Sequence, residues 1–291
     1  MNISIGIPLW IGNFKKRRTS TLLELIAMHG IDYVEVSIDY PWPQYRYSEL
    51  RETIQKLLDQ GVGIGLHAPW RDLAIASPYR DIREASLRII ARSIEPVLEI
   101  GELLYIVVHP TTHQRVEIAE NRKDILESFK ESLVKLSKLV EGRSPVILVE
   151  NLSRGFGGDL TSIVDVVASL NNVKVGICLD VGHLATYYKR YVEGSGYYSS
   201  FNDYLDDVVT ALSSLNNQVP LVHLHDIDGS SEHLLPGEGV LDFKHIYKKI
   251  WVLKPRYVLY EVFRSKKKRI SIEDVLSTAG AGKAWIKVYA P

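Results

Sequence analysis

The chain has a single cysteine, Cys178, so it has no pair of thiols from which to build an internal disulfide framework. No apolar run reaches the roughly 18–20 residues that cross a bilayer, and no basic-then-apolar targeting segment opens the sequence. The 35 Lys and Arg residues balance 35 Asp and Glu residues, so no global basic field exists to attract nucleic acid or a membrane. These absences favour a cytoplasmic protein with no membrane partner, in which Cys178 is an inert buried thiol.

What the chain does have is enough apolar material for one large core. It contains 291 residues, 46% of them hydrophobic, without a low-complexity stretch or a break in composition. Barrels of the α/β class commonly run past 250 residues as one domain. We therefore expect a single domain over residues 1–291.

Six short apolar runs end in residue types that bind metals. Each run is four to eight residues long, rich in β-branched residues and followed by a polar or Gly/Pro-containing loop, as buried parallel strands are. The residues at these ends are His67, His109, Glu150, Asp180 with His183, His223 with His225 and Asp226, and Glu261. Side chains at the carboxyl ends of successive parallel strands converge only if the sheet closes. The pattern predicts a metalloenzyme built on a (β/α)8 TIM barrel, with its site at that end.

Eight strand–helix alternations complete this prediction. The expected strands are 2–8, 32–39, 62–67, 103–109, 146–150, 173–180, 220–225 and 256–262. The expected helices are 19–30, 48–61, 81–101, about 118–141, 159–170, about 201–215, about 242–250 and about 271–278. A long Tyr/Gly/Ser loop is expected after the sixth strand, and the terminal AWIKVYAP is expected to pack over the bottom or side of the barrel.

Local signals mark several helix ends. Gly30 and Gly61 close the first two helices, as glycine commonly does at a helix C-terminus. Asp159 is a plausible N-cap of the fifth helix. Pro96 lies inside the third helix, where a kink is expected.

The ligand types indicate which ions the site would take. Neutral imidazole and carboxylate suit zinc, manganese, magnesium or cobalt. Glu150, central in strand order, is the natural bridge between two cations, with His67 and His109 holding a second ion beside it. His183 and His233 would serve a further ion or the substrate. We expect one to three divalent ions per chain.

The runs LHAPW, VEN, CLDVGH, HLHDIDG and EHLLPGEGVLDF together resemble the xylose isomerase-like TIM barrel superfamily, from about residue 60 to residue 262. That superfamily contains sugar isomerases and epimerases as well as endonuclease IV-type abasic-site nucleases. For the isomerase and epimerase branch, the resemblance implies one metal on Glu150, Asp180, His223 and Glu261. The two glutamates would also act as proton-transferring bases.

The nuclease branch implies nine ligands for three zinc ions. The matching positions are His67, His109, Glu150, Asp180, His183, His223, His233 and Glu261. The ninth ligand should be an Asp two residues before His233, where this chain has Ser231, and Asp228 or Glu232 are the alternatives. The family spacing favours His223 over His225 as the ligand on the seventh strand, which leaves Asp226 and Asp228 to support the site or anchor the loop.

Basic and aromatic residues gather on the loops of the same barrel face. The basic clusters are KKRR (15–18) and RSKKKR (264–269), and the aromatic residues are Trp10, Trp42, Tyr45, Tyr47 and Trp70. They are either solvated surface and loop packing, or contacts to an anionic phosphate and to a sugar ring or unpaired base. The candidate substrate contacts are Trp10, Trp70, His225 and Arg264. Glu35, inside the second strand, would contact the substrate or be a structural carboxylate.

Two enzyme classes fit these patterns. The missing Asp, the zero net charge and the compact loops favour a sugar or sugar-phosphate isomerase or epimerase that stabilises an enediolate, with Glu150, Glu261 and His183 as catalytic residues. His67, His109 and the basic clusters favour the alternative, an endonuclease IV-like phosphodiesterase that acts on nucleic acid. A non-catalytic metal-binding protein is not expected, because burying so many ligands without a task is costly. The sugar, the metal and the oligomeric state stay open.

Overall fold

The computed structural model describes residues 3–10, 19–40, 46–170, 173–215, 218–229 and 231–289. Eight parallel strands close into a barrel in chain order. They are β1 (Ser4–Leu9), β2 (Tyr33–Ser37), β3 (Gly63–His67), β4 (Tyr105–Val108), β5 (Val146–Glu150), β6 (Val175–Asp180), β7 (Leu221–Leu224) and β8 (Tyr257–Tyr260). The last strand pairs with the first, with Ser4 opposite Tyr257. The predicted (β/α)8 barrel is confirmed.

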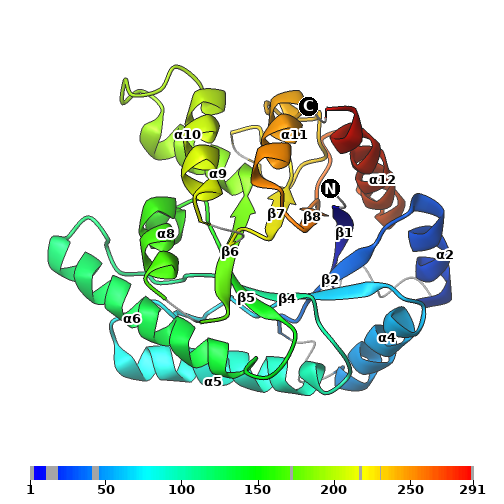
Figure 1. The fold of residues 1–291 in the computed structure, drawn as a ribbon, viewed down its shortest axis with the longest axis horizontal. Helices are drawn as coiled ribbons and strands as arrows, with labels where there is room; N and C mark the ends of the chain where they lie inside the picture. Colours follow the sequence, from blue (N-terminus) through cyan, green and yellow to red (C-terminus); the bar gives the residue numbers. More distant parts are fainter. Residues whose placement is uncertain are drawn as a thin grey trace.

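Helices surround the strands on the outside of the barrel (Figure 1). They are α2 (Thr19–His29), α4 (Tyr47–Asp59), α5 (Arg80–Leu98), α6 (Ala119–Lys138), α7 (Gly155–Gly158), α8 (Leu160–Ala168), α9 (Val181–Tyr187), the π-helix η1 (Tyr188–Val192), α10 (Phe201–Ser213), α11 (Phe243–Leu253) and α12 (Ile272–Val288). None of the helices in the described ranges is both long and apolar enough to traverse a bilayer.

The predicted helix ends agree with the structure at most positions. Gly30 and Gly61 follow α2 and α4 with φ of 63° and 75°, the left-handed conformation that glycine adopts without strain. The Asp159 side chain accepts a hydrogen bond from the Ser162 N–H and caps α8. Pro96 lies in the last turn of α5, which continues to Leu98.

Two expectations need correction. The segment after β6 is not a loop from its start, because Asp180 caps a helix, α9, that leads directly into η1. The eighth helix continues to Val288, well beyond the expected end near residue 278. The described part of the terminal segment therefore forms the last turns of α12.

The lower part of the barrel interior holds three tyrosine rings. Tyr33, Tyr105 and Tyr257 pack with centroids 5.3–5.9 Å apart. Gly6 and Gly65 leave the space for them, since a Cβ at either position would lie 2.3 Å and 2.5 Å from the rings of Tyr33 and Tyr105, respectively. The floor below the site is therefore closed by aromatic packing.

An apolar layer separates these rings from the predicted ligands. Its members are Val107, Leu148, Cys178, Leu221 and Leu259. Each lies two residues before a predicted ligand: His109, Glu150, Asp180, His223 and Glu261 in turn. Because side chains two residues apart in a strand share a face, the ligands take the uppermost inward positions. Burial raises the pKa of Cys178, which keeps its thiol protonated as expected for an inert residue.

Candidate metal centre

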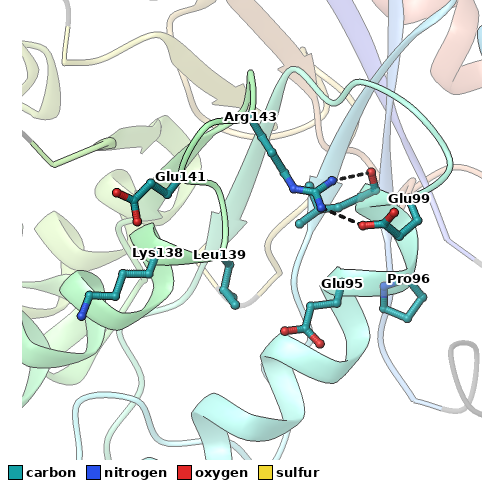
Figure 2. A pocket seen from close by; sticks show the side chains of 8 residues that line it. Glu95, Pro96, Glu99, Lys138, Leu139, Glu141 and Arg143 are labelled. Atoms are coloured by element: carbon teal, nitrogen blue, oxygen red, sulfur yellow. Dashed lines mark hydrogen bonds and ion pairs between the residues drawn. The ribbon is translucent and has the colours of Figure 1, made fainter.

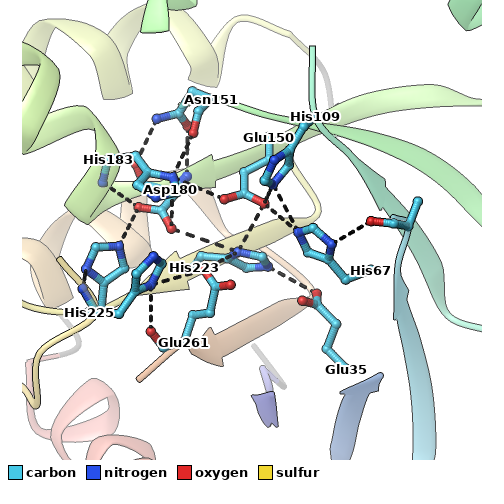
Figure 3. Close-up of polar contacts among 12 residues, drawn as sticks. Glu35, His67, His109, Glu150, Asn151, Asp180, His183, His223, His225 and Glu261 are labelled. Atoms are coloured by element: carbon cyan, nitrogen blue, oxygen red, sulfur yellow. Dashed lines mark hydrogen bonds and ion pairs between the residues drawn. The ribbon is translucent and has the colours of Figure 1, made fainter. Parts of the chain in front are cut away.

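Four side chains from β5 to β8 converge above the apolar layer (Figure 3). Donor atoms of Glu150, Asp180, His223 and Glu261 all lie within 4.8 Å of one another. The Nδ1 atom of His223 is 3.3 Å from Glu261 Oε2, 3.7 Å from Glu150 Oε2 and 3.9 Å from Asp180 Oδ2. The structure thus brings together the four residues that the resemblance implies for a single metal.

Glu35 orients the histidine of this group. The Nε2–H of His223 donates to Glu35 Oε2 across the barrel at 3.1 Å, and both side chains are buried. With Nε2 held by Glu35, Nδ1 of His223 is the nitrogen that faces the three carboxylates and would coordinate a cation. Metal-binding histidines commonly hold a carboxylate with their second nitrogen in this way. Glu35 is therefore a supporting residue of the site, whereas its sequence left a substrate contact and a structural role equally open.

A second group forms around the same glutamate. The Nε2 atoms of His67 and His109 are 3.1 Å apart, and they lie 3.4 Å and 3.2 Å from Glu150 Oε2. The other nitrogen of His67, Nδ1, donates to the Ala68 carbonyl at 3.0 Å, which directs Nε2 toward the glutamate. Glu150 thus belongs to two groups of ligand-type side chains, and its role as a bridge between two ions stays a prediction.

Asn151 fixes the position of Asp180. Its Nδ2–H donates to the Asp180 carbonyl at 2.9 Å, and its Oδ1 accepts the Asp180 N–H at 2.8 Å. The carbonyl of Asn151 also accepts the Nδ1–H of His183 at 3.1 Å. Asn151 is fully buried. It was not among the predicted site residues, although the VEN run contains it.

The remaining histidines meet beside Asp180. His183 lies in the first turn of α9, and His225 Nε2 is 3.2 Å from Asp180 Oδ1. The rings of His225 and His233 are 4.2 Å apart, measured between centroids. One ring nitrogen each of His183, His225 and His233 lies within 4.8 Å of the other two.

Burial and charge compete at these groups. Burial by itself lowers the pKa of His67, but the carboxylates of Glu150, Glu35 and Glu261 together outweigh it and raise the pKa to about 9. Burial also opposes protonation of His183, yet Asp180 and Glu150 raise its pKa to about 10. For His233, burial and the neighbouring imidazoles lower the pKa to about 4. Burial raises the pKa of Glu150, but the surrounding histidines prevail and hold it well below its ordinary value.

The site fits divalent cations by its charge and by its unused lone pairs. Four buried carboxylates, Glu35, Glu150, Asp180 and Glu261, meet here, and their ion-pair partners within the described ranges are all histidines. The atoms Asp180 Oδ2, His223 Nδ1 and Glu261 Oε2 are buried without a hydrogen bond to any described residue. Buried carboxylates at this density need positive charge nearby, which protonated histidines supply in the metal-free protein. A divalent ion would supply that charge and would also accept the unused lone pairs.

The predicted rim residues differ in how they relate to the site. Trp70 lies against His109, with ring centroids 5.1 Å apart, and Arg71 stacks over its indole at 4.6 Å. Trp10 follows β1 and is 39% exposed, and its role in substrate binding stays a prediction. Tyr47 is a packing residue of α4, because its hydroxyl donates to the Pro96 carbonyl at 2.9 Å. Trp42 and Tyr45 lie outside the described residues.

The basic cluster after β8 lies on the surface beside the loop that carries His233. The backbone N–H of Arg264 donates to the His233 carbonyl at 3.0 Å, while its side chain is exposed. Lys266 pairs with Asp228 at 2.8 Å, and Lys268 pairs with Asp274 at 2.5 Å. Part of the cluster is thus committed to acidic neighbours. The other cluster, 15–18, lies outside the described residues.

A separate cavity lies at the opposite end of the barrel (Figure 2). It is lined by the C-terminal ends of α5 and α6 and by the turns that lead from them to the next strands: Glu95, Pro96, Leu98, Glu99, Lys138, Leu139, Glu141 and Arg143. Arg143 crosses it to the Leu98 carbonyl at 3.0 Å and to Glu99 at 2.7 Å. Its lining contains no histidine, and this arrangement is a structural salt bridge on the stability face of the barrel.

Comparisons with known proteins show which family has this architecture. Residues 23–287 match the sequence profile of the family described as xylose isomerase-like TIM barrel. An uncharacterised protein of Methanocaldococcus jannaschii is 27% identical over 244 residues, which cover 81% of this chain and 76% of that protein. A probable endonuclease 4 of Aquifex aeolicus is 25% identical over 204 residues, which cover 67% of this chain and 69% of its own.

Solved structures share the fold. A D-tagatose 3-epimerase-like protein superposes with a TM-score of 0.69 at 22% identity, covering 97% of both chains. Endonuclease IV from Thermus thermophilus superposes with a TM-score of 0.64 at 22% identity, covering 97% of this chain and 98% of its own. An epimerase-like protein and an endonuclease therefore share a barrel of this shape.

Proposed function

The chain belongs to the xylose isomerase-like TIM barrel family, and within that family we propose that it is a multi-metal phosphodiesterase of the endonuclease IV type. The observation that carries this proposal is the convergence of His67 and His109 on Glu150 Oε2, at 3.4 Å and 3.2 Å, beside the four-ligand group. A single metal on that group would leave these two imidazoles without a task. Two cations bridged by one carboxylate match the arrangement that hydrolyses phosphate esters.

The two groups of side chains would bind two adjacent ions. His67, His109 and Glu150 would hold one of them, and Glu150, Asp180, His223 and Glu261 would hold the other. Bound divalent cations would supply Lewis acidity to a phosphoryl oxygen. Glu35 would keep His223 in the tautomer that binds, and Asn151 would hold Asp180 in place.

The mouth of the site supports a substrate with both an anionic and a planar part. Trp70 covers His109, and Arg71 stacks on Trp70 while it pairs with Asp39 at 2.6 Å. The exposed guanidinium of Arg71 above the indole is a planar cationic surface that suits stacking by an unpaired base or a sugar. The exposed basic side chains after β8, beginning at Arg264, would attract a phosphodiester backbone. The 25% identity to a probable endonuclease 4 points in the same direction.

A sugar isomerase or epimerase is the second candidate, and one observation favours it. Glu150 and Glu261 both reach the four-ligand group, where they could move protons on a sugar carbon whose oxygens a single cation polarises. His183, whose pKa is raised to about 10 by Asp180 and Glu150 against the effect of burial, would then donate a hydrogen bond to the substrate. The closed tyrosine floor and the buried carboxylates serve either reaction.

One pair of assays separates the candidates. The protein reconstituted with zinc, manganese or cobalt is incubated with a duplex that contains one abasic site, and in parallel with a panel of free and phosphorylated ketoses in D₂O. We expect nicking of the duplex and no deuterium at any sugar carbon. The His67→Gln/His109→Gln double variant should lose roughly 10²-fold or more of the nicking rate, since it removes one ion position. Deuterium incorporation that persists in the double variant would reject the phosphodiesterase proposal in favour of the epimerase.

A further inference from the structure

Three imidazoles, those of His183, His225 and His233, lie together outside the two groups that share Glu150. Their ring centroids are 5.4 Å apart for His183 and His225, 5.2 Å for His183 and His233, and 4.2 Å for His225 and His233. They come from α9, from the end of β7 and from the loop that follows it. Three of their ring nitrogens lie within 4.8 Å of one another. Zinc holds imidazole nitrogens at about 2.0–2.1 Å, so the three rings would rotate toward one another to share one ion.

In two of these rings a backbone carbonyl holds Nδ1, so Nε2 is the nitrogen that would bind an ion once it has no proton. The Nδ1–H of His183 donates to the Asn151 carbonyl at 3.1 Å, and the Nδ1–H of His233 donates to the Glu261 carbonyl at 3.1 Å. Each bond fixes the ring and leaves Nε2 to act as the ligand atom. A backbone carbonyl on the second nitrogen is the usual support of a metal-binding histidine.

The contacts of His225 depend on its tautomer. The His233 N–H donates to its Nδ1 at 2.9 Å, so Nδ1 is an acceptor in this structure and the proton lies on Nε2, 3.2 Å from Asp180 Oδ1. With the proton on Nε2, the ring supports Asp180. Binding of an ion at Nε2 would move the proton to Nδ1, which would then donate to the Asp226 carbonyl, 3.2 Å away, and would no longer accept the His233 N–H. Nε2 is fully buried and makes no well-formed hydrogen bond to any described residue.

The backbone around His225 is shaped to admit its ring. A Cβ on Gly182 would lie 2.1–2.5 Å from the His225 ring atoms, so no side chain fits at position 182 while the imidazole is in place. Asp226 accepts the N–H groups of Ile227, Gly237, Gly239 and Leu241 at 2.8–3.1 Å, which closes the loop that carries His233. Within that loop, His233 has a φ of 59°, a conformation rarely adopted by residues other than glycine.

We infer that His183, His225 and His233 form a third metal site of their own, in which His225 takes the place of the absent Asp. The sequence alternative Asp228 is otherwise engaged, because it pairs with Lys266 and accepts the Ser231 N–H at 3.0 Å. The inference rests on the proposed function only in that the neighbouring carboxylate groups also hold cations. It deepens that function by assigning the third site a ligand set without any carboxylate.

This ligand set determines which ions enter. Three imidazoles suit zinc or cobalt, whereas magnesium and manganese prefer oxygen ligands. The Glu150 groups contain oxygen ligands and would accept either kind of ion. The three-imidazole site should therefore fill with zinc or cobalt and stay empty with magnesium.

Metal content tests the site without an activity assay. The full-length protein is stripped with a chelator, loaded with zinc or magnesium, freed of excess ion and measured by elemental analysis. We expect His225→Ala to hold one equivalent less zinc than the wild-type protein and the same amount of magnesium. His113→Ala, which changes an exposed histidine outside the site, should match the wild-type protein. Equal zinc content in His225→Ala and the wild-type protein would overturn the inference.

A second variant and a spectrum guard against a folding defect in His225→Ala. Gly182→Ala leaves every ligand in the sequence but occupies the space of the His225 ring, so it should also lose one zinc equivalent. In the wild-type protein, ¹⁵N NMR of His225 should show the proton on Nδ1 after zinc is added. A proton that stays on Nε2 at full zinc loading would contradict the site. A loss of zinc in both variants without nicking by the wild-type protein would sustain the third site and reject the phosphodiesterase alone.

Discussion

The carboxylate half and the imidazole half of this centre are built in different ways. Glu150, Asp180, His223 and Glu261 lie on or directly after four neighbouring hydrogen-bonded strands, so the closed barrel itself positions them. The three imidazoles of the proposed third site depend on a helix start, a strand end and a loop tied together by Asp226. The first half is thus set by the fold, whereas the second is set by side-chain and loop contacts that single substitutions can remove.

The largest effect is expected from a substitution of Glu150, the residue that both ligand groups share. Glu150→Gln keeps the size of the side chain but removes its charge, so both groups should lose metal, and the nicking rate should fall by roughly 10³-fold. The barrel should stay folded, because the apolar layers below do not involve this carboxylate. Elemental analysis, the nicking assay and circular dichroism measure the three quantities. Glu52→Gln, on the exposed face of α4, is the matched control. Unchanged metal content would reject the whole centre.

The next effect is confined to the imidazole half. Asp226→Asn replaces one of two oxygens that accept backbone N–H groups with an NH2 group that cannot accept, which leaves buried donors unpaired at a cost of about 1–3 kcal/mol. We expect the His233 loop to loosen and one zinc equivalent to be lost, while magnesium binding stays at the wild-type level. Denaturant melts and metal analysis report the two effects. Asp165→Asn, an exposed residue of α8, is the control. Parallel loss of magnesium would show that the two halves are not independent.

A smaller effect is expected in the carboxylate half, and it tests the role of Glu35. Glu35→Gln weakens the hydrogen bond that keeps the proton of His223 on Nε2. Loss of such a supporting carboxylate typically reduces metal affinity by about 10–100-fold. Competition with a chelator measures the affinity, which should fall for zinc and magnesium alike. An affinity equal to that of the wild-type protein would make Glu35 a purely structural residue.

The smallest effect concerns the metal-free protein and its pH dependence. The pKa values of His67 and His183 are raised to about 9 and about 10 by neighbouring carboxylates, against the effect of burial. Both values exceed the roughly 6.5 of an unfolded histidine, so their stabilising contribution is complete below about pH 6.5 and is lost as the pH rises through 9 and 10. Chelated protein should therefore become less stable between pH 7 and 10 in thermal melts, and His67→Gln should reduce that decline.

Zinc should reverse this trend. The metal competes with protons for the same nitrogen atoms, so its binding tightens as the pH rises. The stability gained on adding zinc should then grow from pH 6 to pH 8. If the stability gained on adding zinc falls over this range, the titrating histidines are not ligands of the metal.

The strand-end ligands could be predicted because each depends on a local pattern. An inward residue at the end of a β-branched run must lie near its counterparts once the sheet closes, and this identifies Glu150 or Glu261 without knowledge of their neighbours. Glu35 and Asn151 could be assigned no such role, because their functions depend on partners across the barrel or on the next strand. The contact between Glu35 and His223 joins residues 188 positions apart.

The region after β6 was mispredicted for a different reason. Its tyrosines and its glycine at position 182 are weak helix formers, which favoured a loop. The helix α9 forms nevertheless, because the Asp180 side chain accepts the His183 N–H at 2.6 Å and starts it. The sequence predicts His225 as a substrate contact, because the family pattern places the ninth ligand near His233 in sequence. In the structure the His225 and His233 rings are 4.2 Å apart, centroid to centroid, a proximity that the sequence does not reveal.

The close approach of Gly182 to the His225 ring also has a consequence for related sequences. Two positions 43 residues apart compete for one volume, so they should covary. Relatives with a glycine at the position of Gly182 are free to carry an imidazole at the position of His225. Relatives with a larger residue there should carry a smaller side chain in its place and recruit their ninth ligand elsewhere. The residue types at these two positions would then sort members of the family by the composition of their third site.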